Sequence, residues 1–260
     1  MFGNKMVTPA TPERVYTLCK IVEKKALAAA DVRSKMEPEY LTGSSAAYFQ
    51  DYRDAAKELG LISISDNFIS LATSANHVSS TQAMRKFANH QLEKFRDGQF
   101  YKVTQAYFSL GDQVFTKDKN LSNLAPEMTI LTGSTVDAMA MRAWRFWVTF
   151  LGFGYLQDMF LIPNANVFLG DIISTLPIEK GKIYAFGEFI QSILPYAQII
   201  LGSNPTDHQL NYGVSCGLRT LHDMGVIKLE HIMDYDDIWS LYPMKAHPVS
   251  GTVTSITICK

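Results

Sequence analysis

The sequence predicts a mostly α-helical protein with small β-hairpins, built as two similar modules around a helical middle. The first observation is the stretch Ser44–Leu71, in which a helical pattern of apolar residues ends at a glycine and two short strand-like segments follow. The second is the recurrence of this helix–glycine–strand junction, since Leu221–Ile227 echoes Ala56–Ile62. The third is composition, because 47% of the residues are hydrophobic and 19% are charged, which is typical of a chain with a large buried core.

The N-terminal module, residues 1–75, is predicted to begin with two helices. Thr11 followed by Pro12 favours a helix start, because threonine is a good cap and proline fits the first helical position. A second short helix is expected over Ala26–Met36, followed by a turn over Glu37–Gly43.

The third helix of this module leads into a hairpin. Ser44 or Ser45 is the expected N-cap, and Gly60 is the expected left-handed residue at the end. The inward stripe consists of Tyr48, Tyr52, Ala55 and Leu59. Strands are expected over Leu61–Ser65 and Phe68–Leu71, with a tight turn at Asp66-Asn67.

The middle region, residues 76–180, is predicted to be helical. Helices are expected over Gln82–Arg96, Gln99–Phe115 and Val136–Leu151, with a polar linker over Lys117–Thr129. The third of these helices is apolar nearly all round, which predicts a central and buried position. Gly152 echoes the helix–glycine junction weakly. If the echo is real, residues 155–169 form a degenerate hairpin around Pro163-Asn164, and this alternative stays open.

The C-terminal module, residues 181–260, repeats the order of the first. Its opening helices are expected over Ile183–Leu194 and Pro195–Leu201. A helix that ends at Gly225 follows, with Leu210, Val214, Leu218 and Leu221 on its apolar side. The two strands of the hairpin are expected at Ile227–Glu230 and Thr252–Ile258, with a long connection between them.

Charge and cysteine content limit the classes of function. The net charge is −1, although residues 1–35 carry seven basic and three acidic side chains and residues 121–260 carry eight basic and twelve acidic ones. Cys19, Cys216 and Cys259 never form a C-x-x-C pair, which fits a reducing cytoplasm without disulfides or a zinc site. The first fifteen residues contain no apolar run, so no signal peptide is expected. The most apolar stretches contain charged residues and are interpreted as core helices, so no membrane partner is expected.

Three common enzyme signatures are absent from the sequence. No phosphate-binding loop, dinucleotide fingerprint or metalloprotease motif occurs. His222 and His231 flank a predicted strand with Asp223 and Asp234 nearby, but no second ligand pair has helical spacing. We interpret them as surface or capping histidines. We expect a protein without catalytic residues, cofactor or metal.

The order helix, helix, helix, hairpin over residues 10–72 resembles the winged-helix superfamily, here in tandem. In that family the third helix lies in the DNA major groove and the hairpin, or wing, touches the backbone. In the N-terminal module the resemblance places DNA contacts on Ser44, Ser45, Tyr48, Gln50, Arg53, Lys57 and the wing residue Asn67. In the C-terminal module it places them on His208, Gln209, Asn211, Tyr212, Ser215 and Arg219.

Phosphate contact needs cations, and the third helix of the N-terminal module offers few. Arg53 and Lys57 are opposed by acidic neighbours on the same helix, which disfavours base readout. The basic residues that precede this helix are expected to make the phosphate contacts instead. They are Lys24, Lys25, Arg33 and Lys35.

Tandem winged-helix proteins often act as adaptors, for example the kleisin-interacting subunits of chromosome-organising ATPase complexes. The acidic and aromatic segment Asp234–Tyr242 favours such a role, because aromatic residues on a connection are typical interface anchors. The expected anchors are Tyr235, Trp239 and Tyr242. The alternative that they pack on their own domain stays open.

The sequence therefore predicts a non-catalytic subunit of a prokaryotic DNA-acting assembly, in chromosome maintenance or phage defence. Its expected partners are protein subunits, with double-stranded DNA backbone as a further one. The first alternative is a stand-alone transcriptional regulator, which would prefer one duplex sequence. The second is an enzyme of unrecognised type, which would have a deep pocket with converging polar groups.

Overall fold

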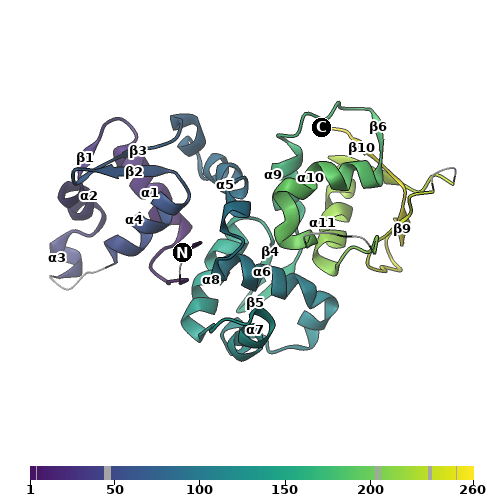
Figure 1. Ribbon diagram of the computed structural model, residues 1–260, viewed down its shortest axis with the longest axis horizontal. Coiled ribbons are helices and arrows are strands. Elements are labelled where there is room, and N and C mark those ends of the chain that lie inside the picture. The colour runs from purple at the N-terminus through teal and green to yellow at the C-terminus, as the bar shows by residue number, and fades with distance from the viewer. Residues whose placement is uncertain (4, 44–47, 203–204, 206, 234–235, 250) are drawn as a thin grey trace.

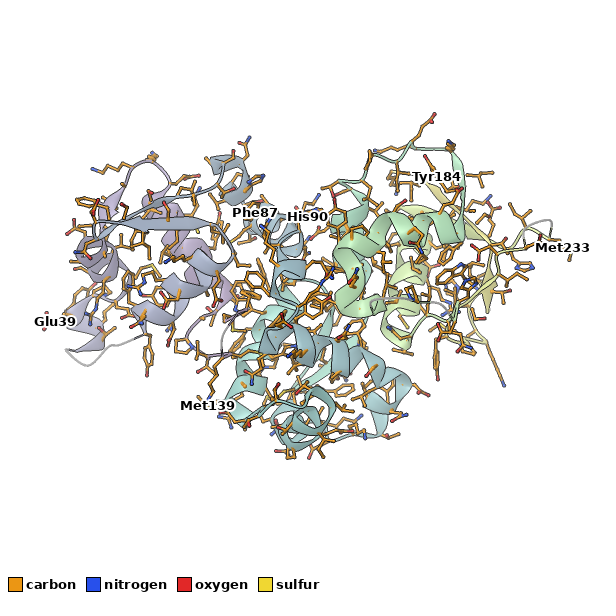
Figure 2. All side chains as sticks on the ribbon, viewed as in Figure 1. Glu39, Phe87, His90, Met139, Tyr184 and Met233 are labelled. Carbon is orange, nitrogen blue, oxygen red and sulfur yellow. The ribbon has the colours of Figure 1, made fainter. Side chains whose placement is uncertain are left out.

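The computed structural model describes residues 1–3, 5–43, 48–202, 205, 207–233, 236–249 and 251–260. The protein is mostly helical (51% helix) with small antiparallel sheets of two and three strands, as the sequence predicts. It forms an elongated molecule in which the first and last units lie at opposite ends of the long axis, with the middle helices between them (Figure 1). Glu39 and Met233 mark the two ends (Figure 2).

The first unit contains four helices and three strands. They are α1 (Pro12–Val22), β1 (Leu27–Ala28), α2 (Ala29–Met36), α3 (Glu39–Thr42), α4 (Phe49–Glu58), β2 (Ile62–Ser65) and β3 (Phe68–Leu71). Thr11 caps α1 as predicted, its side chain accepting a hydrogen bond from the Arg14 amide. The hairpin turns at Asp66 and Asn67, which both have positive φ, as a two-residue turn of the kind expected requires. The predicted second helix begins three residues late, because β1 pairs with β3.

The middle unit contains short 3₁₀ segments between its helices. Its elements are η1 (Ala75–Val78), α5 (Thr81–Asn89), η2 (Leu92–Phe95), α6 (Gln99–Ser109), η3 (Gly111–Thr116), η4 (Leu121–Leu124), α7 (Ala125–Thr132), α8 (Ala138–Phe150), β4 (Gly154–Gln157) and β5 (Phe160–Pro163). The predicted linker over Lys117–Thr129 is wrong, since η4 and most of α7 lie there. The apolar spacing of Leu121, Leu124 and Met128, all buried, is the helical signal that the polar neighbours obscured.

The weak echo at Gly152 corresponds to a real hairpin with a different turn. Gly152 has φ +84 and ends α8, and β4 pairs with β5. The turn lies at Asp158, which has φ +55, and not at Pro163-Asn164. Pro163 instead ends β5 opposite Gly154. The predicted turn residues are therefore wrong, because Pro163 lies within the strand pairing.

The last unit repeats the topology of the first. It contains α9 (Asn166–Ile173), β6 (Ile183–Ala185), α10 (Phe186–Leu201), α11 (Tyr212–Asp223), β7 (Ile227–Glu230), β8 (Trp239–Ser240), β9 (Thr252–Val253) and β10 (Ser255–Ile258). The strand order β6-β10-β7 matches the order β1-β3-β2, with the final strand in the centre. The two predicted helices over Ile183–Leu194 and Pro195–Leu201 are one helix, with Pro195 inside it at an exposed position. The prediction is also wrong at Ile183–Ala185, which form β6 and pair with β10.

One continuous core joins the three units. The ring of Phe2 lies 5.1 Å from that of Phe100 on α6 and 4.8 Å from that of Trp147 on α8. Trp147 also donates its indole N–H to the carbonyl of Ala10. The segment before α1 therefore packs the first unit against the middle one.

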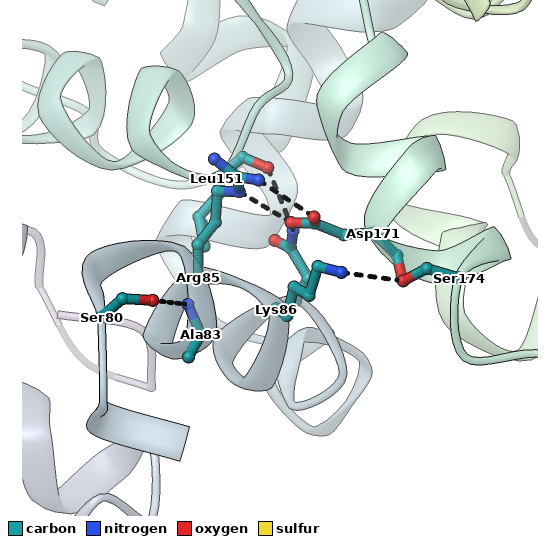
Figure 3. A network of polar contacts seen from close by, with 8 residues as sticks. Ser80, Ala83, Arg85, Lys86, Leu151, Asp171 and Ser174 are labelled. Carbon is teal, nitrogen blue, oxygen red and sulfur yellow. Dashed lines mark hydrogen bonds and ion pairs between the residues drawn. The ribbon is translucent and has the colours of Figure 1, made fainter. Parts of the chain in front are cut away.

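A second joint connects α5 to α9 through an ion pair. Arg85 donates from Nε and Nη2 to the two carboxylate oxygens of Asp171, at 2.7 and 3.0 Å (Figure 3). Asn89 donates from Nδ2 to Asp171 at 3.0 Å and to the carbonyl of Leu151 at 3.1 Å. The Asp171 side chain is 4% exposed, so the carboxylate is almost fully enclosed by these donors. The pair fixes the middle unit against the last one.

Candidate functional site

The four predicted phosphate contacts lie on the surface of the first unit. Lys24 and Lys25 are exposed in the loop after α1, and Arg33 and Lys35 are exposed on α2. The amide of Ala29, where α2 begins, donates to the carbonyl of Asn67 at 2.7 Å. Asn67 itself is exposed at the turn of the hairpin. The basic helix therefore begins beside the hairpin turn, and the two form one edge of the unit.

The helix that precedes the hairpin of this unit, α4, presents a mixed surface. It is the fourth helix and not the predicted third, because α3 lies within the predicted turn Glu37–Gly43. Gln50 and Lys57 are exposed. Tyr48 is 54% exposed and is the N-cap residue of α4, so its predicted place in the inward stripe and the predicted cap at Ser44 or Ser45 are wrong; Phe49 is buried instead. The guanidinium of Arg53 pairs with Asp54 at 2.8 Å, so its charge is neutralised within the helix. Ser44 and Ser45, also predicted to contact DNA, lie outside the described residues. The helix itself contributes few cations, and the surrounding loop and α2 contribute more.

Two residues of the last unit that were predicted to contact DNA, Asn211 and Arg219, make contacts within the protein instead. Asn211 caps α11 by accepting from the Val214 amide at 3.0 Å, and it donates to the Ile200 carbonyl at 2.7 Å. Arg219 is 2% exposed and donates from Nε to the carbonyl of Val249 at 2.9 Å. Burial lowers the pKa of Arg219 below its usual value. The burial of Arg219 contradicts its predicted role, because a buried guanidinium does not reach a phosphate.

Arg219 is buried because the long connection between β7 and β10 folds back over α11. The amide of Tyr242 in this connection donates to the hydroxyl of Ser215 on α11 at 2.8 Å, and Val249 accepts from Arg219. The helical pattern assigned Ser215 and Arg219 to the polar side of the helix. The Nε–H of Arg219 and the hydroxyl of Ser215 are hydrogen-bonded inside the protein and do not face DNA.

Of the predicted partner anchors, Trp239 is buried and Tyr242 is half-buried against its own chain. Trp239 is 2% exposed and its ring stacks on that of His208 at 4.6 Å with 8° between the planes. Tyr242 donates to Asp112 at 2.6 Å, and this hydrogen bond raises the pKa of Tyr242. Tyr235 lies outside the described residues. The alternative that these aromatic residues pack on their own chain holds for Trp239 and Tyr242.

The middle unit exposes apolar side chains that the sequence interpretation missed. Met139 and Phe146 on α8 are 50% and 36% exposed, and Ile130 on α7 is 80% exposed. Met139 lies at the outer edge of this unit (Figure 2). Arg142 stands between Met139 and Phe146 at helical spacing and is also exposed. The polar residues Arg142, Arg145 and Thr149 on a mostly apolar helix are the signal that one face points outward.

A hollow of about 550 Å³ lies beside the β4–β5 hairpin. Its lining residues are Phe115, Asp118, Lys119, Asn120, Gln157, Asp158, Met159, Phe160 and Ile162. Gln157 and Phe160 are cross-strand partners, and Ile162 follows two residues along β5 on the same face of the hairpin. The sequence interpretation missed this hollow, because it treated residues 117–129 as a linker and placed the hairpin turn at Pro163-Asn164.

A metal site and a membrane-spanning helix are two further features that would indicate function. Within the described part of the chain, no three histidine, cysteine, aspartate or glutamate side chains gather closely enough to hold a metal ion. Among the same residues, none of the helices combines the length and apolar character that crossing a bilayer requires.

Comparisons with protein-family models, with curated proteins and with solved structures find no match to this chain. Its function is therefore inferred from its own geometry.

Proposed function

We propose that the three units are tandem winged-helix modules, and that the protein is a non-catalytic adaptor in a prokaryotic DNA-acting assembly of the chromosome-maintenance or phage-defence kind. Support for the modules comes from the repeated element order and from the matching sheets β1-β3-β2 and β6-β10-β7. The middle unit follows the same order from α6 to the β4–β5 hairpin, with two strands in place of three.

The observation that carries the proposal is the difference between the surfaces near the three hairpins. In the first unit Lys24, Lys25 and Lys35 are exposed on the loop after α1 and on α2, the helix that begins beside the hairpin turn. The outward face of α8 exposes two large apolar side chains, Met139 and Phe146, around Arg142. The polar face of α11 is covered by the protein's own connection. The first module is therefore suited to DNA backbone, the middle one to a protein, and the last one to neither.

Binding to duplex DNA tests the first part of the proposal. Fluorescence anisotropy with random duplexes, at low and at physiological salt, should show micromolar affinity that falls steeply with salt. A Lys24→Ala/Lys25→Ala/Lys35→Ala variant should bind far more weakly. Each lost phosphate contact should also reduce the slope of log K against log salt by about 0.9.

A charge-matched control is available in the last unit. Lys180, Lys182 and Lys245 are exposed there, and their replacement by alanine removes the same charge. This control should bind as the unchanged protein does. Equal weakening in both variants would contradict a DNA surface on the first module. Tight binding that survives salt and prefers one sequence would support a transcriptional regulator instead. Absence of binding at any salt would remove DNA from the proposed function.

A further inference from the structure

The hollow beside the β4–β5 hairpin has the size and walls of a side-chain pocket. Its volume of about 550 Å³ lies within the range of small-ligand sites in proteins. Phe115 and Phe160 form aromatic walls, with ring centroids 5.9 Å apart and planes inclined by 55°. Met159 and Ile162 add apolar surface. Such walls favour an occupant with an aliphatic or aromatic body.

One side chain of the protein already shows which polar group these walls accept. The ammonium of Lys119 lies 4.3 Å from the centre of the Phe160 ring. It also donates to the carbonyl of Phe115 at 2.8 Å. A cation over an aromatic face is attracted by the negative charge density of the ring. The pocket is therefore suited to an ammonium group on a flexible stem.

The charges at the rim favour a second cation. Asp118 and Asp158 both line the hollow, against the single ammonium of Lys119. Asp118 accepts hydrogen bonds at 2.8 Å from the Asn120 amide and from Asn123 Nδ2. These bonds lower the pKa of Asp118, so it stays ionised at neutral pH. The lining residues therefore carry one more negative than positive charge, which favours basic ligands over phosphates, although the guanidinium of Arg145 contacts the lining residue Met159 at 2.7 Å and offsets part of this charge.

We propose that this pocket receives a lysine side chain from an extended segment of a partner protein, which displaces Lys119 from the Phe160 ring. The stem of the incoming lysine packs along the apolar side chains that line the hollow, and its ammonium takes the place of Lys119 over the Phe160 ring, beside the carboxylates of the lining. Lys119 acts as a resident competitor that covers the ring in the free protein. The inference rests on the proposed adaptor function, since it specifies the chemistry of the protein partner.

The test uses the full chain and three short peptides. The probe is a blocked pentapeptide with a central lysine among glycines. Matched peptides have norleucine, which keeps the straight stem without the charge, or glutamate at that position. Methyl NMR signals of Met159 and Ile162 report occupancy. The lysine peptide should shift both signals saturably in the millimolar range that a single side chain provides, and the other two peptides should bind far more weakly.

Variants separate this pocket from general charge effects. Lys119→Met removes the resident ammonium and should tighten binding of the lysine peptide by about two- to fivefold, the range expected from an exposed cation–π contact. Asp158→Asn should weaken it. Lys180→Met removes the same charge from the last unit, where Lys180 is exposed, and should leave binding unchanged.

Three outcomes would overturn the inference. They are equal binding of the norleucine and lysine peptides, unchanged affinity in Lys119→Met, and no shift with any peptide. None of these measurements involves DNA, so a failed anisotropy experiment and a failed peptide titration remain distinguishable.

Discussion

The ion pair between Arg85 and Asp171 leads to a quantitative prediction. Asp171→Asn keeps the shape of the side chain but removes its charge, and leaves the guanidinium without a counter-ion. Removing one partner of a buried pair typically costs about 3–5 kcal/mol. Because the Arg85 side chain is 22% exposed and retains some water, we expect the lower end of that range, about 3 kcal/mol.

Urea unfolding measures this cost. With an m-value of about 3 kcal/mol/M, the midpoint should fall by about 1 M. Arg85→Met and the double variant Arg85→Met/Asp171→Asn complete a double-mutant cycle, in which the coupling energy should exceed about 1 kcal/mol. Lys5→Met is the matched control. It removes an ion pair with Asp137 whose side chains are 65% and 44% exposed, and it should cost less than about 1 kcal/mol.

Two results would show that the Arg85–Asp171 ion pair does not stabilise the protein. One is a midpoint for Asp171→Asn equal to that of Lys5→Met. The other is strict additivity of the two single changes, because then Arg85 and Asp171 would not stabilise each other. Either result would mean that the Arg85–Asp171 ion pair does not stabilise the joint between α5 and α9.

Three further predictions concern protonation, backbone strain and thiol reactivity. Burial lowers the pKa of His90 below 6.5, so the unfolded state binds this proton more readily. Stability should therefore fall as the pH drops from 6.5 through the lowered pKa, and a His90→Gln variant should lose this part of the pH profile by calorimetry. Gly60→Ala should cost about 1–2 kcal/mol, because φ is +70 but the space is open. Gly152→Ala should cost clearly more in the same urea assay, since the added carbon would lie 2.6 Å from a neighbouring side chain; equal costs would contradict this. Finally, burial raises the pKa of Cys19 to about 12, whereas Cys259 is exposed. A colorimetric thiol reagent should find a single fast-reacting cysteine, lost in Cys259→Ser, and rapid reaction of Cys19 in the folded protein would contradict its burial.

Local signals made the first unit predictable. Thr11 before Pro12, the positive φ of Gly60 and the Asp66-Asn67 turn each follow from the chemistry of one or two residues. The pairing of Leu27 with Ile69 did not follow, because a two-residue edge strand has no periodicity of its own.

The candidate sites were less predictable because they depend on distant segments. The helical pattern gave the correct side for Arg219, but the connection that covers this side returns thirty residues later at Val249. The hollow combines Phe115 with Phe160 across a segment that resembled a linker. The pattern of apolar and polar residues along a helix indicates which side packs against the rest of its unit. It does not indicate whether another segment of the chain will cover the opposite side.

The order of strands in the last sheet also bears on how the protein folds during synthesis. The hairpin of the first unit is complete once Leu71 has left the ribosome, and β1 is already present to pair with it. In the last unit, β6 and β7 have no common partner until β10, which extends to Ile258, has been translated. Their unpaired edges and the apolar residues that β10 covers stay open for that interval, which is the condition under which nascent chains associate wrongly. The last unit is therefore where a chaperone would act on this protein, after the first has already folded.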